Sequence, residues 1–218
     1  MCSAGDAESA KLDAEWQRLA KASKPSEKEI RDALFTAPIP ETLRPELWMK
    51  HSGAFKASKR GLFASLMNAP ERSPGEHAQI ELDIGRSGVH EEEGQNALRR
   101  VLRAYSAFRK STGYVQGQNF IAAGLLRAMP EEEAFWLLVV VIDKYLPDHF
   151  THAMSGSFVD SRVLAELLAR RLPDVSTRLV CQPVSIFRPL GRPIHAAHLA
   201  CSPRDRWIDT VLRRPTWT

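Results

Sequence analysis

The sequence predicts an all-α fold, and two observations support that prediction. Apolar residues recur at helical spacing in four segments, 95–110, 119–129, 131–145 and 158–172. No segment keeps the alternation of apolar and polar residues that is typical of a half-buried strand. The length of 218 residues favours one domain or one two-lobed domain, and a composition of 44% hydrophobic and 26% charged residues argues against wholesale disorder.

The first 28 residues are polar and charged, so 1–28 is predicted to be an extension before the main domain. Ser26 and Glu29 have the form of a capping box, in which each side chain accepts a backbone N–H of the other residue, and this predicts that a helix begins there. Two short helix faces are also expected in this part of the chain. They are formed by Leu12, Trp16 and Leu19 and, further on, by Leu43, Leu47 and Trp48.

The strongest predicted helix, Gln95–Lys110, has an apolar stripe opposite several arginines. The segment before it, Ile80–Gly94, contains three glycines and many charges and is predicted to be a loop. Glu131–Tyr145 begins with glutamates, which suit the positive end of a helix dipole, and is then apolar on all sides, which predicts burial. In Phe158–Leu172 one face carries four leucines: Leu164, Leu167, Leu168 and Leu172.

The net charge of +4 is located at the end of the chain. Residues 183–218 contain six arginines, no lysine and two aspartates, whereas the remaining 182 residues balance at 24 basic and 24 acidic side chains. A neutral body argues against a nucleic-acid-binding surface, so a basic helical nucleic-acid binder is the second alternative and no nucleic acid is expected as a partner. The same segment holds five of the 14 prolines, and 181–218 is predicted to be a divergent, poorly ordered basic tail.

Several classes of site are excluded by the sequence. It has no glycine-rich phosphate loop and no nucleophile elbow, so nucleotide hydrolysis by this chain alone is unsupported. Its histidines lack neighbouring metal ligands and its three cysteines are far apart, so no metal and no cofactor is predicted and a reducing, cytoplasmic compartment is favoured. No secretory signal is apparent, and the longest apolar run is too short to span a bilayer.

Two segments carry side chains suited to phosphoryl-transfer chemistry. Arg86 follows Asp83 by three residues, a spacing at which the carboxylate can hold the guanidinium. Gln116 lies between glycines just before a predicted helix, where its amide can stand clear of the scaffold. Taken singly, the first segment is equally typical of a surface ion pair, and the second of an ordinary turn with a helix cap at Asn119. Together they are the arginine and the glutamine that GTPase reactions need.

Three motifs occur in order and together resemble the TBC domain, the family of GTPase-activating proteins for Rab GTPases. Pro38–Trp48 contains I-P-x-x-L-R-x-x-x-W, Ile80–Arg86 matches I-x-x-D-x-x-R, and Tyr114–Gly117 matches Y-x-Q-G. The likeness runs from about residue 30 to about residue 178. It implies a TBC (Rab-GAP) domain over 29–180 with an all-helical, two-lobed fold.

The resemblance also implies that two side chains act in trans on a GTP-bound Rab, with Mg²⁺ bound on the Rab side. Arg86 is expected to be an arginine finger, and Gln116 to replace the glutamine of the GTPase in positioning water. The chain would then be a GTPase activator rather than an enzyme, associated with endomembranes peripherally and only through the Rab. Supporting roles are assigned to Asp83, which would hold Arg86, to Tyr114 and Gly117, which would shape the glutamine loop, and to Arg44, Trp48 and Asn119 as structural or interface residues.

The sequence departs from the family pattern at several places. Pro38, Ser87 and Gln118 stand where the family usually has glycine, threonine and an apolar residue. The second-lobe segment of the family, with a W-F pair and an R-x-W-D element, has no counterpart after Phe187, so the second lobe is expected to be truncated. A non-catalytic Rab-binding module of the same fold is therefore the first alternative, and GTP hydrolysis assays with purified Rab proteins separate the two.

Residues after about Phe187 are predicted to be the product of a shifted reading frame or a retained intron, because family likeness and helical spacing are lost together there. Such an ending cannot cover the leucine face of Phe158–Leu172, where each buried leucine would contribute about 1.5–3 kcal/mol, so the isolated chain is expected to be marginally stable. Transcript sequencing tests the origin: an in-frame ending at Thr218, with no W-F segment in another frame, contradicts it. A cooperative, high-melting unfolding transition contradicts the stability part.

Overall fold

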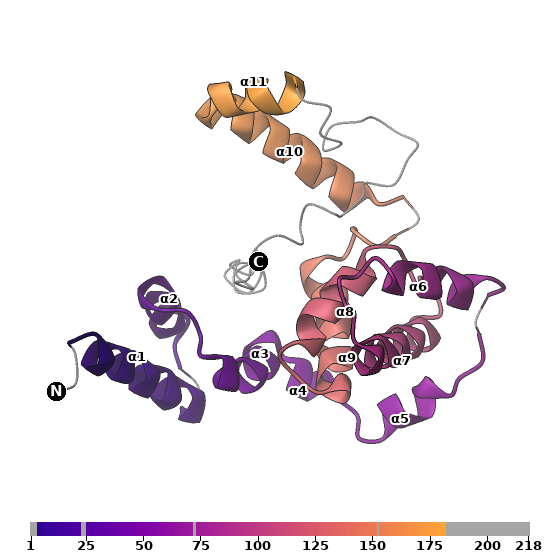
Figure 1. Ribbon diagram of the computed structural model, residues 1–218, viewed down its shortest axis with the longest axis horizontal. Helices are drawn as coiled ribbons and strands as arrows, with labels where there is room; N and C mark the ends of the chain where they lie inside the picture. Colours follow the sequence, from indigo (N-terminus) through magenta and orange to yellow (C-terminus); the bar gives the residue numbers. More distant parts are fainter. Residues whose placement is uncertain (1–3, 23–24, 72, 152, 182–218) are drawn as a thin grey trace.

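The computed structural model describes residues 4–22, 25–71, 73–151 and 153–181 (Figure 1). In chain order the elements are α1 (Ala4–Lys21), α2 (Glu27–Thr36), the 3-10 turn η1 (Glu41–Leu43), α3 (Arg44–Ser52), α4 (Ala54–Ala57), α5 (Leu62–Met67), α6 (Glu76–Ile84), α7 (Glu92–Phe108), α8 (Gln118–Leu126), α9 (Glu131–Val140), the π-helical turn η2 (Val141–Tyr145), α10 (Ser155–Arg171) and α11 (Pro173–Cys181). These residues contain no strand, and the prediction of an all-α fold is confirmed. The tail predicted over 181–218 lies, apart from its first residue, outside the described residues.

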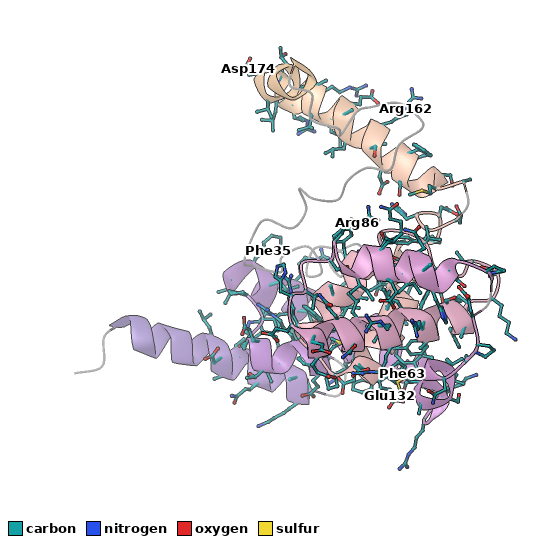
Figure 2. The ribbon with its side chains drawn as sticks, turned by 45° about the vertical axis from the view of Figure 1, so that its right-hand side comes forward. Phe35, Phe63, Arg86, Glu132, Arg162 and Asp174 are labelled. Carbon is teal, nitrogen blue, oxygen red and sulfur yellow. The ribbon has the colours of Figure 1, made fainter. Side chains whose placement is uncertain are left out.

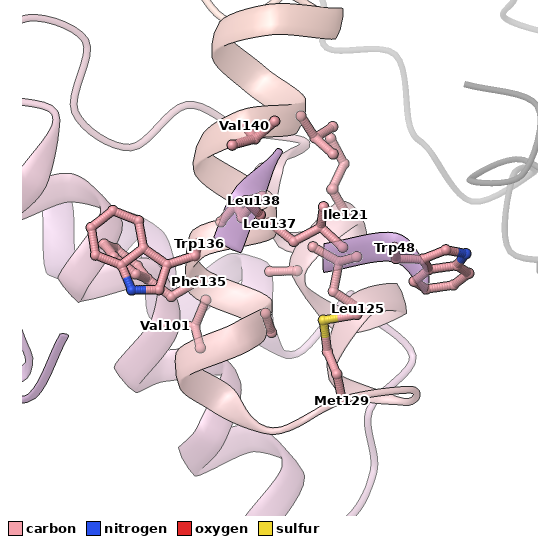
Figure 3. Packing of buried hydrophobic residues seen from close by; sticks show 14 of the residues in the cluster. Trp48, Val101, Ile121, Leu125, Met129, Phe135, Trp136, Leu137, Leu138 and Val140 are labelled. Carbon is pink, nitrogen blue, oxygen red and sulfur yellow. The ribbon is translucent and has the colours of Figure 1, made fainter. Parts of the chain in front are cut away.

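Helix α9 is the centre of the hydrophobic core. Its residues from 134 onward are buried because α3, α4, α7 and α8 all pack against it. Figure 3 shows Trp48 of α3, Val101 of α7 and Leu125 of α8 in the same buried cluster as Phe135 of α9. The predicted helix over Glu131–Tyr145 and its burial are confirmed, with the last turn widened into η2.

Helix α7 is amphipathic, as predicted, although it begins at Glu92, three residues earlier than expected. The apolar stripe is buried at Leu98, Val101, Leu102 and Tyr105. On the opposite face, Arg99 donates from Nε and Nη2 to the Glu81 carboxylate of α6 at 2.6 and 2.8 Å. Arg100 binds Glu131 of α9 in the same forked way, at 2.8 and 2.7 Å. These two ion pairs fix α7 between α6 and α9.

The prediction of a loop over Ile80–Gly94 is wrong. Residues 76–84 form α6, and only the turn over 85–91 separates this helix from α7. Glycines and charges made the segment resemble a loop, but Ile80 and Ile84 are buried where α6 packs on α7 and α8. Short helices owe most of their stability to such packing rather than to local sequence. The candidate aspartate and arginine therefore lie at the end of a helix.

The first two helices agree with the sequence pattern. Trp16, on the predicted face of α1, is 2% exposed. Ser26 and Glu29 form the predicted capping box of α2, with Ser26 Oγ accepting the N–H of Glu29 at 3.2 Å and the Glu29 carboxylate accepting the N–H of Ser26 at 2.8 Å. Lys50 of α3 donates to two main-chain carbonyls at the end of α1, at 2.8 and 2.5 Å. Helix α1 thus packs on the body, and the domain boundary at residue 28 stays a prediction.

Helices α10 and α11 form a hairpin that projects from the body (Figure 1). Helix α10 begins three residues before the predicted Phe158, and Pro173, which was expected to follow the helix, is the first residue of α11, where a missing N–H is tolerated. No residue of α10 is buried. Three leucines of the predicted face are about half exposed and one is partly buried: Leu164 (49%), Leu167 (49%) and Leu172 (51%), and Leu168. The described residues leave this face uncovered, and the effect of the segment after Phe187 on it stays a prediction.

Phe135→Ala is expected to lower the free energy of unfolding by about 3–5 kcal/mol. The ring centroid of Phe135 lies 5.3 Å from that of Phe63 and 5.7 Å from that of Phe108, so the truncation leaves a cavity among aromatic rings. Urea unfolding measures the change. Phe55→Ala removes the same atoms from a half-exposed ring and should cost far less. Equal losses for the two variants would contradict the central position of α9.

Candidate functional site

Helix α6 places Asp83 and Arg86 at its C-terminal end. Asp83 lies in the last turn and its side chain is 1% exposed, whereas the side chain of Arg86, in the turn that follows, is 42% exposed. Figure 2 shows Arg86 at the surface of the helical body, on the side from which the α10–α11 hairpin leaves. Nη2 of Arg86 forms an ion pair with Oδ1 of Asp83. The contact predicted from the spacing of these two residues is therefore present.

The Asp83 carboxylate receives donors on both oxygens. In addition to Arg86 on Oδ1, the hydroxyl of Tyr114 donates to Oδ2 at 2.7 Å and Nε2 of Gln79 donates to it at 3.2 Å. A buried carboxylate needs such partners because an unpaired charge in the interior is strongly destabilising. Burial and then the hydrogen bond to Asp83 raise the pKa of Tyr114, so its hydroxyl remains a neutral donor at physiological pH. Tyr114 thereby ties its own loop to α6.

The loop over 113–117 presents Gln116 between two glycines with positive φ. Gly113 and Gly117 have φ angles of 66° and 103°, a region that favours glycine. At Gly117 a Cβ would also lie 3.3 Å from the ring of Phe150, which is closer than ordinary packing. The side chain of Gln116 is partly buried and makes no hydrogen bond with any described residue. Both ends of its amide therefore remain available to a partner molecule.

Asn119 joins the two candidate segments. Its Nδ2 donates to the Asp83 carbonyl at 3.1 Å and to the Ser87 hydroxyl at 2.8 Å, while its Oδ1 accepts the N–H of Gly117 at 3.0 Å. Asn119 is the second residue of α8 and Gly117 holds the cap position, so Asn119 is a bridge rather than an ordinary helix cap. Ser87 replaces a threonine of the family pattern and supplies the same hydroxyl, which donates to the Asp83 carbonyl at 2.7 Å.

The other two sequence-predicted residues make structural contacts. Trp48, on α3, is fully buried beside α9 (Figure 3). Arg44, the first residue of α3, donates from Nε to the carbonyl of Ile39 at 3.2 Å and lies 3.7 Å from the Glu41 carboxylate. Two of the predicted residues therefore make structural contacts in α3, and the others lie in the two segments that meet at Asp83.

Two acidic residues of α6 take part in the site although the sequence pattern did not predict them. Glu76, its first residue, accepts the N–H of Tyr114 on Oε1 at 2.6 Å. Glu81 binds the α7 arginines, and its pKa is lowered mainly by the hydrogen bond from Arg99. A signal for Glu76 exists, because it precedes Asp83 by seven residues and so lies on the same helix face. That signal could not be read while the segment was taken for a loop.

The described histidines, cysteines and carboxylates nowhere form a group of three that could hold a metal ion. None of the helices that the structure describes has the length and apolar composition needed to cross a membrane. A groove of about 400 Å³ between α1 and α2 has an apolar floor at Trp16 and Ala33 and acidic side chains at its rim. It contains none of the candidate residues.

Tyr114→Phe is expected to lower the free energy of unfolding by about 1.5–3 kcal/mol, because it removes a hydrogen bond to the buried Asp83 carboxylate without changing the shape of the ring. Denaturant unfolding measures the loss. Tyr145→Phe is the matched control, since the Tyr145 hydroxyl makes no hydrogen bond with any described residue, and its effect should stay within about 0.5 kcal/mol. If both variants unfold at the same denaturant concentration, the Tyr114 bond contributes nothing.

Comparison with known proteins places this arrangement in a family. Residues 41–186 match the model of the Rab-GTPase-TBC domain. The chain is 34% identical over 183 residues to Small G protein signaling modulator 3 of Bos taurus, covering 77% of this chain and 24% of that protein. The Mus musculus protein of the same name is 34% identical over 178 residues, with the same coverage. The chain thus spans about a quarter of the length of the curated relatives it matches.

Two solved structures share the fold. The Chlamydomonas flagellar RabGAP TBC domain superposes with a TM-score of 0.62 at 29% identity, over 80% of this chain and 62% of that one. The Ypt/Rab-GAP domain of Gyp1p superposes with a TM-score of 0.60 at 20% identity, over 78% of this chain and 68% of that one, and supports the fold alone. The all-α architecture is therefore TBC-type, whereas the truncation of the second lobe stays a prediction. Because the family model matches well over half of its residues, the chain belongs to the Rab-GTPase-TBC domain family.

Proposed function

We propose that this chain is a GTPase-activating protein for a Rab-type GTPase, to which it supplies Arg86 and Gln116 in trans. The observation that carries the proposal is the contact between two segments at Asp83. One segment carries the half-exposed guanidinium of Arg86 and the other the carboxamide of Gln116, and hydrogen bonds from Tyr114 and Asn119 join them. Membership of the TBC family supports a small GTPase as the partner. The name of the relatives, Small G protein signaling modulator 3, agrees with that choice.

Stimulation of GTP hydrolysis requires two groups from the activator, one that stabilises charge on the phosphate oxygens and one that orients the attacking water. In GTP hydrolysis, water attacks the γ-phosphorus while the bond to the β-phosphate oxygen breaks, and negative charge spreads over the phosphate oxygens. The guanidinium of Arg86 would donate to those oxygens as their charge increases. The amide of Gln116 would accept a hydrogen bond from the attacking water and donate to a γ-phosphate oxygen. Mg²⁺ and the nucleotide would be held by the GTPase.

The residues around the two fingers would act by holding them. Asp83 fixes one N–H of Arg86, and the positive φ of Gly117 turns the chain directly after Gln116. A Rab-binding module of the same fold without activity is the alternative, and stimulated hydrolysis rather than binding separates the two. Any association with endomembranes is proposed to be peripheral and to depend on the GTPase.

Arg86→Ala is expected to remove most of the stimulated hydrolysis, since an arginine finger contributes about 10³–10⁵ in rate. Arg86→Lys should restore little because lysine lacks the planar fork of donors. Single-turnover hydrolysis on a panel of GTP-loaded Rab proteins measures the rate, and complex formation should be largely unchanged. Near-normal stimulation by the alanine variant would remove Arg86 from the mechanism.

Gln116→Ala tests the second group separately. If Gln116 orients water in trans, a Rab whose own catalytic glutamine is replaced should still be activated by the wild-type chain. The Gln116→Ala variant should then fail to activate either form of the Rab. The decisive comparison is between the two Rab forms with the wild-type chain: if the substituted Rab does not respond while the wild-type Rab does, Gln116 does not replace the GTPase glutamine.

A further inference from the structure

Helix α6 holds Tyr114 at both ends of that residue. At the first turn of the helix, Oε1 of Glu76 accepts the main-chain N–H of Tyr114 at 2.6 Å, and at the last turn Oδ2 of Asp83 accepts its hydroxyl at 2.7 Å. Glu76 and Asp83 are seven residues apart, almost two full turns, so they lie on one face of the helix with Ile80 between them. The tyrosine therefore lies along that face and is fixed at its backbone and at its tip.

The bond from Glu76 is the one that reaches the main chain of the glutamine loop. Glu76 is buried, and its carboxylate lies at the N-terminal end of a helix, where negative charge is stabilised. A charge-assisted bond of this length is among the stronger contacts that a backbone N–H can make. It fixes the chain two residues before Gln116.

Three main-chain N–H groups around Gln116, those of Tyr114, Val115 and Gly117, are held by side chains. The N–H of Tyr114 donates to Glu76, that of Val115 donates to Oε1 of Gln118 at 3.2 Å, and that of Gly117 donates to Oδ1 of Asn119 at 3.0 Å. Gln118 and Asn119 belong to α8, directly after the loop, and come with it in sequence. Of these three acceptors, Glu76 is the one from a distant segment, and together with Asp83 it sets where the loop lies relative to α6.

We propose that Glu76 is a positioning residue for Gln116, which fixes the start of the glutamine loop against the helix that carries Arg86. This inference rests on the proposed function. Without Glu76 the loop keeps its local bonds to α8 and its hydroxyl bond to Asp83 but loses its main-chain anchor on α6. A displacement of about 1 Å in a group that orients a reactant can lower a rate about 100-fold.

The test is single-turnover GTP hydrolysis stimulated by the full chain, with variants Glu76→Ala, Glu76→Gln and Glu92→Ala. Glu92 is the matched control, since it is the first residue of α7 as Glu76 is of α6, but is exposed. Glu76→Ala is expected to lower the maximal rate about 10- to 100-fold with little change in the Rab concentration at half-maximal rate. Glu76→Gln keeps an acceptor oxygen and should recover part of the loss, and Glu92→Ala should match the wild type.

A double variant separates positioning from general damage. If Glu76 acts through Gln116, then Glu76→Ala combined with Gln116→Ala should be no slower than Gln116→Ala alone. The proposal is overturned if the rate losses of Glu76→Ala and Gln116→Ala multiply in the double variant, or if Glu76→Ala and Glu92→Ala lose the same amount of rate. A full rate for Gln116→Ala itself overturns the glutamine part of the proposed function instead.

Amide hydrogen exchange over residues 113–118 gives a readout that does not need the GTPase. The N–H of Tyr114 should be protected in the wild type and exchange at least tenfold faster in Glu76→Ala, while α9 keeps its protection. Faster exchange throughout the chain would indicate unfolding, in which case the milder Glu76→Gln variant decides. Unchanged exchange at Tyr114 in both variants overturns the assignment of Glu76.

Discussion

The buried carboxylate of Asp83 is the interaction on which the candidate site depends. It accepts hydrogen bonds from Arg86, Tyr114 and Gln79, and the main-chain carbonyl of Asp83 accepts one from Asn119. A charge in this environment is tolerated only while its donors stay in place, so the helix before Arg86 and the loop before α8 stabilise each other's position. Two segments that are about 30 residues apart in sequence thereby become one structural unit.

The hydrophobic core provides the rigid support for that unit. Helix α9 is buried by its neighbours, α7 lies on it through an apolar stripe, and α6 is held to the outer face of α7 by Glu81 and Arg99. The buried core thus fixes α7, and the partly exposed ion pair between Glu81 and Arg99 then fixes α6 and its polar site residues. This order of packing explains how the nine-residue helix α6 can hold the turn that carries Arg86 and the loop that carries Gln116, although it buries few apolar side chains of its own.

The parts of the fold that were predicted correctly are those with a strong local signal. Long apolar periodicity predicted α7, α8, α9 and α10, and the Ser26 capping box predicted the start of α2. Helix α6 was missed because packing stabilises it, while Gly85 and Gly88 next to it suggest a loop. In the site, spacing alone predicted the pair of Asp83 and Arg86. Glu76 was not found because its seven-residue spacing from Asp83 places the two on one face only in a helix, and the segment around Asp83 was predicted to be a loop.

The ion pair between Arg86 and Asp83 also lowers the conformational entropy that the Arg86 side chain loses when a partner binds. An arginine side chain loses about 2 kcal/mol of rotamer freedom when it is immobilised. In this chain part of that loss has already occurred in the isolated protein, because Asp83 is itself buried and fixed by Tyr114. Guanidinium has five N–H donors, and a single terminal nitrogen, Nη2, contacts the aspartate, so the other nitrogens, which bind no other described side chain, can donate to an anion. The group is therefore pre-organised before a partner binds, and less of the binding free energy is then lost to ordering it.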